Sequence, residues 1–173
     1  HHHLDPEEKK PLYDRLIQSL QKISTNDEVE IIPQTMPPFP WHFGGQRYHN
    51  LFVDANFIKA FHEDTGMRVC LDVSHSKLAC NHLDASFSEF LKKILPFTAH
   101  LHLADAQGVD GEGLQIKDGE IDWTELFNLI NAHCPNASFI PEIWQGHKNR
   151  GEGAWIALER LEHYSSATKI NLN

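Results

Sequence analysis

The stretch TAHLHLAD at residues 98–105 alternates polar and apolar side chains and ends in an aspartate. Alternation with a period of two predicts a β-strand, and it places His100 and His102 on the same face of that strand. The acidic, glycine-rich stretch AQGVDGEG at residues 106–113 follows directly and predicts a loop. Two imidazoles on one face indicate either a buried metal site or two core histidines with ordinary hydrogen-bond partners.

Strand-like and helix-like segments alternate about four times along the chain. Apolar stretches predict strands at residues 29–33, 67–73, 98–105 and 137–144. Helical spacing and capping residues predict helices at residues 5–23, 54–65, 84–95, 122–133 and 151–164. This order predicts an α/β fold in which parallel βα repeats are joined by right-handed crossovers.

Length and composition favour a single domain over residues 1–173, in which residues 1–4 are either the remnant of an affinity tag or the end of a cut strand. The formal net charge of −9 argues against nucleic-acid binding. No apolar run approaches the roughly 20 residues that span a membrane. The cysteines have no paired spacing, which suggests reduced thiols and a cytoplasmic location.

Polar side chains end each predicted strand, where parallel α/β proteins bind their ligands. Alternation places Asp72, His102 and Glu142 on the same face of three neighbouring strands, and Gln34 and His75 also follow strand ends. A lone buried carboxylate is costly, so Asp72 is difficult to explain as a packing residue. Two carboxylates and an imidazole at one level of a sheet form a mixed site that suits Mn²⁺, Zn²⁺, Co²⁺ or Mg²⁺.

The motifs VCLDVSH, HLHLAD, DGEIDW and FIPEIWQGH resemble those of the xylose-isomerase-like TIM barrel family. The loop stretches DGEGLQI and PEIWQGHKNRGEG are most similar to the isomerase-like domain associated with sialic-acid-type synthases. The resemblance implies the carboxyl-terminal half of a (β/α)8 barrel, because about four of the eight βα units are present. The other half is then expected in the same chain, in another chain, or in a second copy that forms a homodimer.

The resemblance also implies roles for individual residues. Asp72, His102 and Glu142 match metal ligands, and Glu142 doubles as an acid/base. Gln34 of QTMP stands where the family has a glutamate ligand, and an amide is a poorer ligand that cannot act as a base. His75 matches a histidine that touches metal or substrate.

Further residues are expected to contact substrate. Asp105 and the loop through Glu112 match the family segment that does so. Trp144, His147 and Lys148 follow the last strand and are expected on the rim of the site.

The implied function is a divalent-metal-dependent isomerase or epimerase acting on a sugar or sugar phosphate, in sialic-acid-type (nonulosonate) or surface-glycan biosynthesis. The metal would polarise the substrate oxygens while a carboxylate moves a proton next to the carbonyl. Two alternatives stay open. One is a non-catalytic carbohydrate-binding module, which Gln34 favours. The other is a metal-dependent phosphodiesterase of the endonuclease branch, which needs three clustered metals and a loop histidine that DGEG lacks.

Overall fold

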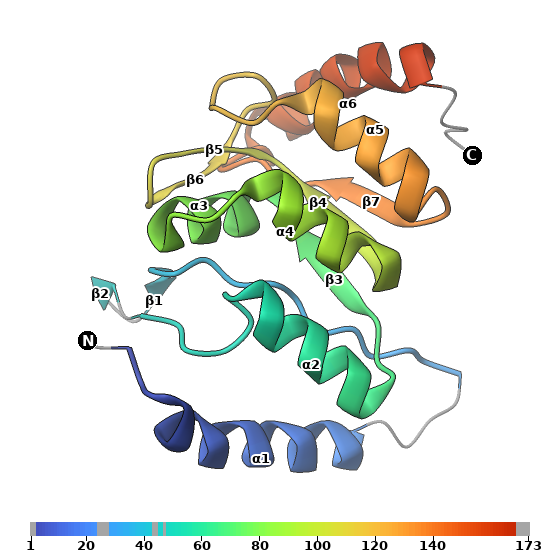
Figure 1. Ribbon diagram of the computed structural model, residues 1–173. Coiled ribbons are helices and arrows are strands. Elements are labelled where there is room, and N and C mark those ends of the chain that lie inside the picture. Colours follow the sequence, from blue (N-terminus) through green and yellow to red (C-terminus); the bar gives the residue numbers. More distant parts are fainter. Residues whose placement is uncertain (1–2, 24–27, 43–44, 47, 169–173) are drawn as a thin grey trace.

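A parallel sheet of three strands lies at the centre of the fold. The computed structural model describes residues 3–23, 28–42, 45–46 and 48–168. The strands β3 (Val69–Asp72), β4 (Thr98–Leu103) and β7 (Ser138–Pro141) are hydrogen-bonded in the order β3-β4-β7 (Figure 1). The register pairs Asp72 with His102 and His102 with Ile140, so the carboxyl ends of the strands meet at one edge.

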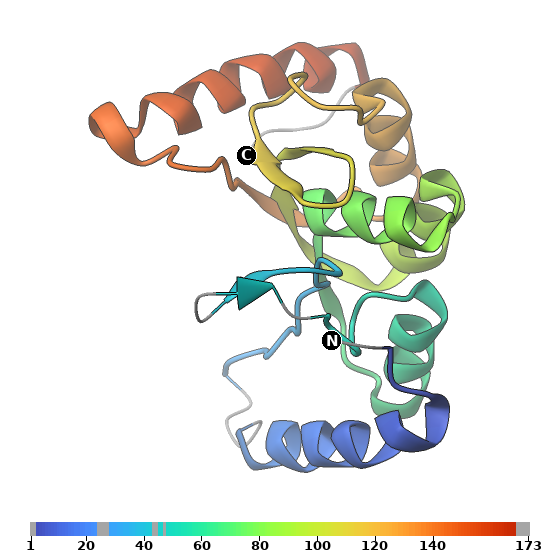
Figure 2. The ribbon, with the colours of Figure 1, turned by 90° about the vertical axis from the view of Figure 1, so that its left-hand side faces the viewer.

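Helices cover one face of this sheet. Figures 1 and 2 show α1 (Pro6–Ile23), α2 (Ala55–Thr65), α4 (Phe87–Ile94) and α5 (Trp123–His133) side by side. Helix α6 (Lys148–Thr168) packs on α5 and β7, and its backbone is kinked at residues 149–151. Alternate strand residues such as Leu71 and Leu101 belong to the buried core. The residues between them face the opposite side of the sheet, where Ile140 is 45% exposed.

The predicted α/β fold with parallel strands is confirmed, and the described part of the chain forms a partial barrel. Side-chain caps begin three of the helices. The side chains of Asp54, Ser86 and Asp122 accept backbone hydrogen bonds at the first turns of α2, α4 and α5. Gly66 ends α2 with a left-handed φ of 69°, a conformation that favours glycine.

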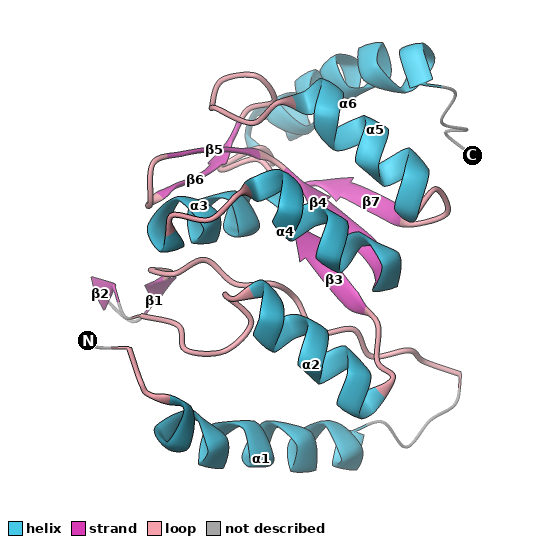
Figure 3. Cartoon of the chain, viewed as in Figure 1, coloured by secondary structure: helices cyan, strands magenta, loops and turns pink. Residues whose placement is uncertain are grey.

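The first predicted strand, at residues 29–33, is wrong. This segment runs beside β3 as a loop (Figure 3) and forms a single parallel bridge between Gln34 and Cys70. The Pro33 carbonyl accepts from the Cys70 N–H at 2.9 Å, and the Thr35 N–H donates to the Cys70 carbonyl at 3.0 Å. Because Pro33 has no N–H, it cannot extend a regular ladder. The segment nevertheless occupies the place of a fourth strand.

Several elements were not predicted. Helix α3 (Val73–Leu83) begins directly after β3, and β5 (Asp105–Gln107) pairs with β6 (Gly111–Leu114) in an antiparallel hairpin. A short hairpin joins β1 (Trp41–His42) to β2 (Gly45–Gln46), and a 3-10 turn, Leu95–Phe97, precedes β4. The β5–β6 hairpin and α3 both lie at the carboxyl end of the sheet, where the predicted site residues meet.

Two further expectations concern membranes and the chain start. None of the described helices combines the length and apolar character needed to cross a bilayer. Residues 1 and 2 lie outside the described set, so the expectation for residues 1–4 stays a prediction.

Candidate metal centre

Asp72 uses its two carboxylate oxygens for different purposes. It ends β3 and is also the N-cap of α3, because its Oδ1 accepts the His75 N–H at 2.8 Å. The other oxygen, Oδ2, accepts from Gln34 Nε2 at 3.0 Å and faces His102. The residue is 3% exposed. The strand-to-helix junction therefore fixes this carboxylate and aims one oxygen at the neighbouring strand.

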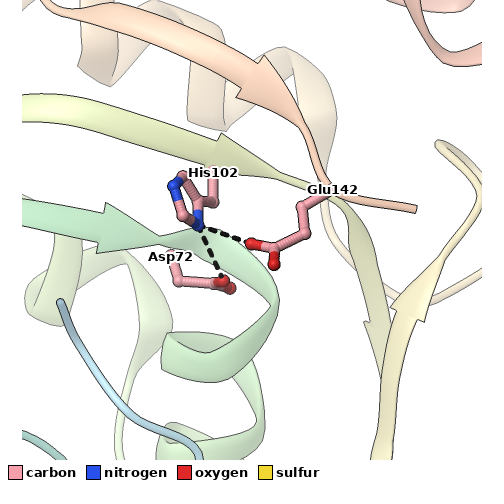
Figure 4. A group of neighbouring side chains, drawn as sticks. All are labelled: Asp72, His102 and Glu142. Carbon is pink, nitrogen blue, oxygen red and sulfur yellow. Dashed lines mark ion pairs between the residues drawn. The ribbon is translucent and has the colours of Figure 1, made fainter. Parts of the chain in front are cut away.

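His102 and Glu142 complete a cluster with Asp72 (Figure 4). His102 Nδ1 lies 3.7 Å from Asp72 Oδ2 and 2.5 Å from Glu142 Oε2. One possible ligand atom from each residue lies within 4.8 Å of the other two. Glu142 follows β7, where its N–H is held by the Leu103 carbonyl at 3.0 Å, and its side chain is 53% exposed. The predicted convergence of three strand ends is thus observed.

The electrostatics of this cluster favour a positive charge at its centre. The acidic groups around His102, Asp72 first and then Cys70 and Glu142, raise the pKa of its imidazole to about 12. In turn, His102 lowers the pKa of Glu142. The carboxylates that stabilise the protonated ring would also stabilise a metal cation. The cation would replace the proton, because a metal needs a deprotonated nitrogen as its ligand.

The donor atoms also fit a divalent metal. His102 Nδ1 is buried and lies within ion-pair distance of two carboxylate oxygens, one from Asp72 and one from Glu142. A metal ion bound there would take the place of the ring proton between the same three groups. One imidazole nitrogen and two carboxylate oxygens are ligands that Mn²⁺, Zn²⁺ and Co²⁺ accept.

A cavity of about 300 Å³ opens beside the cluster. Five of the residues expected to bind metal or substrate line it together with Asp72: His75, Glu112, Glu142, Trp144 and His147. His75 Nδ1 lies 3.1 Å from the Thr35 carbonyl, which can only accept, so this nitrogen carries a hydrogen. The other ring nitrogen, Nε2, lies 3.7 Å from Glu112 Oε2.

Asp105 does not reach the cavity, in contrast to the expected substrate contact. The residue is 0% exposed, and its two oxygens accept four hydrogen bonds. The donors are three backbone N–H groups, of Ala106, Lys117 and Ile121, and the indole N–H of Trp123, at 2.8 to 3.1 Å. The carboxylate therefore connects β5, the segment after β6 and the start of α5. It has no oxygen directed at a substrate.

Lys148 and His100 are not members of the cluster, although the His100 ring packs edge-on against that of His102. Lys148 is exposed, donates to Gln145 Oε1 at 3.0 Å and is not among the residues that line the cavity. His100 shares its strand face with His102, but its Nδ1 is 2.7 Å from Ser138 Oγ, an ordinary polar partner. Its pKa is lowered, chiefly by burial. His100 is a natural control for His102.

Comparison with known proteins identifies the family. The family model described as xylose isomerase-like TIM barrel matches residues 1–164. The chain belongs to this family. A solved structure described as a D-tagatose 3-epimerase-like protein matches with a TM-score of 0.63 and 16% identity, over 96% of this chain and 57% of that one. At this identity the likeness concerns the fold, and the chain spans little more than half of that protein. None of the curated proteins compared with the chain matches it.

Gln34 departs from the glutamate expected at this place in the family. It lies beside Asp72 and donates its amide N–H to that carboxylate, so in this arrangement the amide nitrogen supports a ligand and is not itself one. The predicted direct metal contact of Gln34 therefore stays a prediction. It would require the amide oxygen to turn toward the cluster.

Two polar residues that support the site were not predicted. Thr35 is 0% exposed, and its hydroxyl accepts the Asp72 N–H at 2.9 Å. Ser74 is 2% exposed, and its hydroxyl accepts the Gly113 N–H at 3.0 Å, which fixes the β5–β6 hairpin against α3. Thr35 is adjacent to Gln34 and Ser74 is adjacent to His75, and both of these neighbours were predicted site residues. The available signal was a polar side chain within an otherwise buried stretch.

Proposed function

We propose that this chain supplies the metal centre and acid/base of a divalent-metal-dependent sugar isomerase or epimerase. Family membership supports the coarser assignment to this enzyme class. The observation that carries the proposal is the convergence of Asp72, His102 and Glu142, which each bring one possible ligand atom within 4.8 Å of the other two. A metal bound there would act as a Lewis acid on carbonyl and hydroxyl oxygens of the substrate.

Glu142 is the proposed proton carrier. Its carboxylate lines the cavity and is more exposed than that of Asp72, so it can meet a substrate carbon. Its pKa is lowered, chiefly by the contact with His102, so the carboxylate is ionised, as a group that accepts a proton must be. His75 presents Nε2 to the same cavity and would orient a hydroxyl group.

Metal binding is the first test. Asp72→Ala, His102→Ala and Glu142→Ala are each expected to weaken Mn²⁺ binding by more than the roughly 10–100-fold that changes to supporting residues cause. His100→Ala is the matched control, because it removes an imidazole from the same strand face that packs against His102 but is not one of the three possible ligands. Calorimetric titration of the four variants would refute the proposal if all bound Mn²⁺ like the wild type.

Gln34 supports a second candidate function, a carbohydrate-binding module without catalysis. If catalysis needs carboxylates on both sides of the substrate, the amide at this position removes one of them. The two functions differ in proton exchange: an isomerase or epimerase in D2O incorporates deuterium at a sugar carbon, which proton NMR detects, and a binding module does not. An endonuclease-type phosphodiesterase receives less support, because the described residues offer a single group of three metal-ligating side chains.

We also propose that another four βα units complete the barrel. The chain spans 57% of the similar solved structure, and Ile140 on the uncovered sheet face is exposed. A homodimer is less well supported, because α1 already packs on α2 through Tyr13. If two copies closed one barrel, α6 of the second copy would have to occupy the position beside α2 that α1 already fills. Sedimentation analysis tests this proposal, and a symmetric dimer would overturn it.

The biosynthetic role and the cellular compartment of this activity are also proposals. The loop stretches DGEGLQI and PEIWQGHKNRGEG support a role in sialic-acid-type biosynthesis, which substrate profiling with N-acetylated amino sugars would test. Cys70, Cys80 and Cys134 are free and buried, which supports a reducing, cytoplasmic compartment.

A further inference from the structure

We propose that Thr35 is a positioning residue that serves two groups of the site at once. Its buried hydroxyl holds the backbone of Asp72, and this leaves its carbonyl free to hold the hydrogen on His75 Nδ1. The neutral His75 ring then presents Nε2 to the cavity as an acceptor for a substrate hydroxyl group. The proposal rests on the proposed function, because both groups belong to the proposed centre.

The backbone beside β3 shows where a regular parallel ladder would continue. Cys70 donates its N–H to the Pro33 carbonyl at 2.9 Å and accepts the Thr35 N–H at 3.0 Å. This pattern repeats every two residues, so the Asp72 N–H would next donate to the Thr35 carbonyl, and the Asp72 carbonyl would accept from residue 37. Residue 37 is a proline and has no N–H. The ladder therefore cannot continue in its regular form.

The Thr35 hydroxyl takes over both places in the ladder. Its Oγ1 accepts the Asp72 N–H at 2.9 Å and lies 3.3 Å from the Asp72 carbonyl, to which it can donate. Ser76 Oγ donates to the same carbonyl at 2.7 Å and lies 3.1 Å from Thr35 Oγ1. Both hydroxyl residues are buried, so water cannot replace them. Without the Thr35 hydroxyl, the buried Asp72 N–H would lose its partner.

The Thr35 carbonyl is consequently available to His75. It lies 3.1 Å from His75 Nδ1, and a carbonyl can only accept, so Nδ1 carries a hydrogen. An oxygen of Asp72 lies 3.3 Å from the same nitrogen, and a bare Nδ1 would face the lone pairs of both oxygens. The Gln34 amide nitrogen is farther away, at 3.5 Å, and donates to Asp72 at 3.0 Å. The surroundings of Nδ1 therefore favour the tautomer with its hydrogen on that nitrogen.

The other side of the His75 ring faces the cavity. In the neutral ring the lone pair is on Nε2, so this nitrogen accepts a hydrogen bond and cannot donate one. Glu112 Oε2 lies 3.7 Å from Nε2 and pairs with the ring when the ring is protonated. Nδ1 carries its hydrogen in either state. Thr35 thus determines which groups of a substrate His75 can bind: a hydroxyl that donates, but not a carbonyl oxygen.

Three variants separate this role from a general contribution to folding. Thr35→Val removes the hydroxyl and keeps the side-chain shape, and Thr35→Ser keeps the hydroxyl. Thr65→Val is the matched control. The Thr65 hydroxyl also accepts a backbone N–H, from Met67 at 3.1 Å, and donates to the Phe61 carbonyl at 2.7 Å, but it lies on α2 and does not line the cavity.

The first measurement is the tautomer of His75 in the metal-free chain. Nitrogen-15 NMR of the imidazole nitrogens at about pH 8, where an ordinary histidine is neutral, distinguishes the two tautomers, and His75→Gln assigns the signals. We expect hydrogen on Nδ1 in the wild type, Thr35→Ser and Thr65→Val. In Thr35→Val the Asp72 N–H has to turn to the carbonyl at position 35. His75 should then shift toward the tautomer with hydrogen on Nε2.

The second measurement is Mn²⁺ affinity by calorimetric titration. Thr35→Val should weaken binding by roughly 10–100-fold, as is typical when a group that supports a metal ligand is removed. Thr35→Ser and Thr65→Val should stay within about threefold of the wild type. A merely structural role of Thr35 would instead lower the urea midpoint and leave the tautomer and the Mn²⁺ affinity of the folded protein unchanged.

Three results would overturn the proposal: hydrogen on Nε2 of His75 in the wild type, an unchanged tautomer in folded Thr35→Val, or unchanged Mn²⁺ affinity in that variant. If Thr35→Val does not fold, Thr35→Cys takes its place, because a thiol is a weak hydrogen-bonding group of similar size. It should shift both readouts in the same direction by a smaller amount, and no shift would likewise overturn the proposal.

Failure of the proposed function would look different. If Asp72→Ala bound Mn²⁺ like the wild type, the metal-dependent function would fail. The tautomer of His75 would still report on Thr35, because it is measured without metal. Conversely, if Mn²⁺ binding depends on Asp72 but the tautomer does not depend on Thr35, the proposed function stands and only the positioning role fails.

Discussion

Replacing Asp105 with asparagine is expected to destabilise the protein severely without a direct effect on the metal centre. The two carboxylate oxygens of Asp105 each accept two hydrogen bonds from buried or part-buried donors. Asparagine keeps one acceptor oxygen and turns an NH2 group toward the other two donors. Each unsatisfied donor costs about 1–3 kcal/mol, so Asp105→Asn should lower the free energy of unfolding by about 2–6 kcal/mol. Domains are typically stable by only about 5–15 kcal/mol, so the loss is large.

Urea unfolding followed by circular dichroism measures this loss. Asp118→Asn is the matched control, because Asp118 is exposed and pairs with Arg160 at the surface, where such pairs contribute at most about 1 kcal/mol. Adding Trp123→Phe to Asp105→Asn removes one of the donors, so the double variant should lose less stability than the sum of the two single variants.

The outcome separates two roles of Asp105. A structural role predicts a large loss of stability and unchanged Mn²⁺ affinity in the fraction that folds. The substrate contact expected from sequence predicts the reverse, weaker sugar binding with stability retained. A loss of less than about 1 kcal/mol on Asp105→Asn would refute the structural role.

Three further predictions concern the centre and its support. Asp72→Asn keeps an N-cap for α3 but removes the carboxylate that faces His102, so the metal-free protein should still fold, with reduced stability, while Mn²⁺ affinity falls at least about 100-fold; calorimetry and urea unfolding check this, and wild-type affinity would contradict it. Because the raised pKa of His102, about 12, keeps a proton on the metal-free ring at pH 7, Mn²⁺ binding should release about one proton and strengthen as pH rises. Titrations in two buffers of different ionisation enthalpy detect that proton, and identical heats would rule it out. Gly119→Ala should lower the melting temperature by several degrees, because its Cβ would lie 2.3 Å from both the Ala106 carbonyl and Asp105 Oδ1; an unchanged melting curve would argue against this packing.

The sequence predicted the centre because the rule that applies there is simple. Side chains alternate along a strand, and parallel strands align their carboxyl ends, so Asp72, His102 and Glu142 could be placed together without coordinates. The observed register, with Asp72 opposite His102, agrees with that expectation.

The rest of the region depends on contacts that periodicity does not encode. Helix α3 buries residues all round, from Val73 and Ser74 to Cys80, so its sequence lacks a one-sided apolar pattern. The hydrogen bonds of Asp105 come from groups as far as 18 positions along the chain, which a local motif cannot reveal. A match to a family motif therefore indicated where Asp105 lies but not which groups donate hydrogen bonds to its carboxylate.

The divided use of the Asp72 carboxylate has a consequence for evolution. Under the proposed function, Asp72 serves the start of α3 as well as a metal, so a lineage that lost catalysis would still tend to keep it. Glu142 is half exposed and caps no helix, and a lineage without chemistry would let it drift. The identity of the residue at position 142 is accordingly the sharper marker of retained catalysis among relatives of this chain.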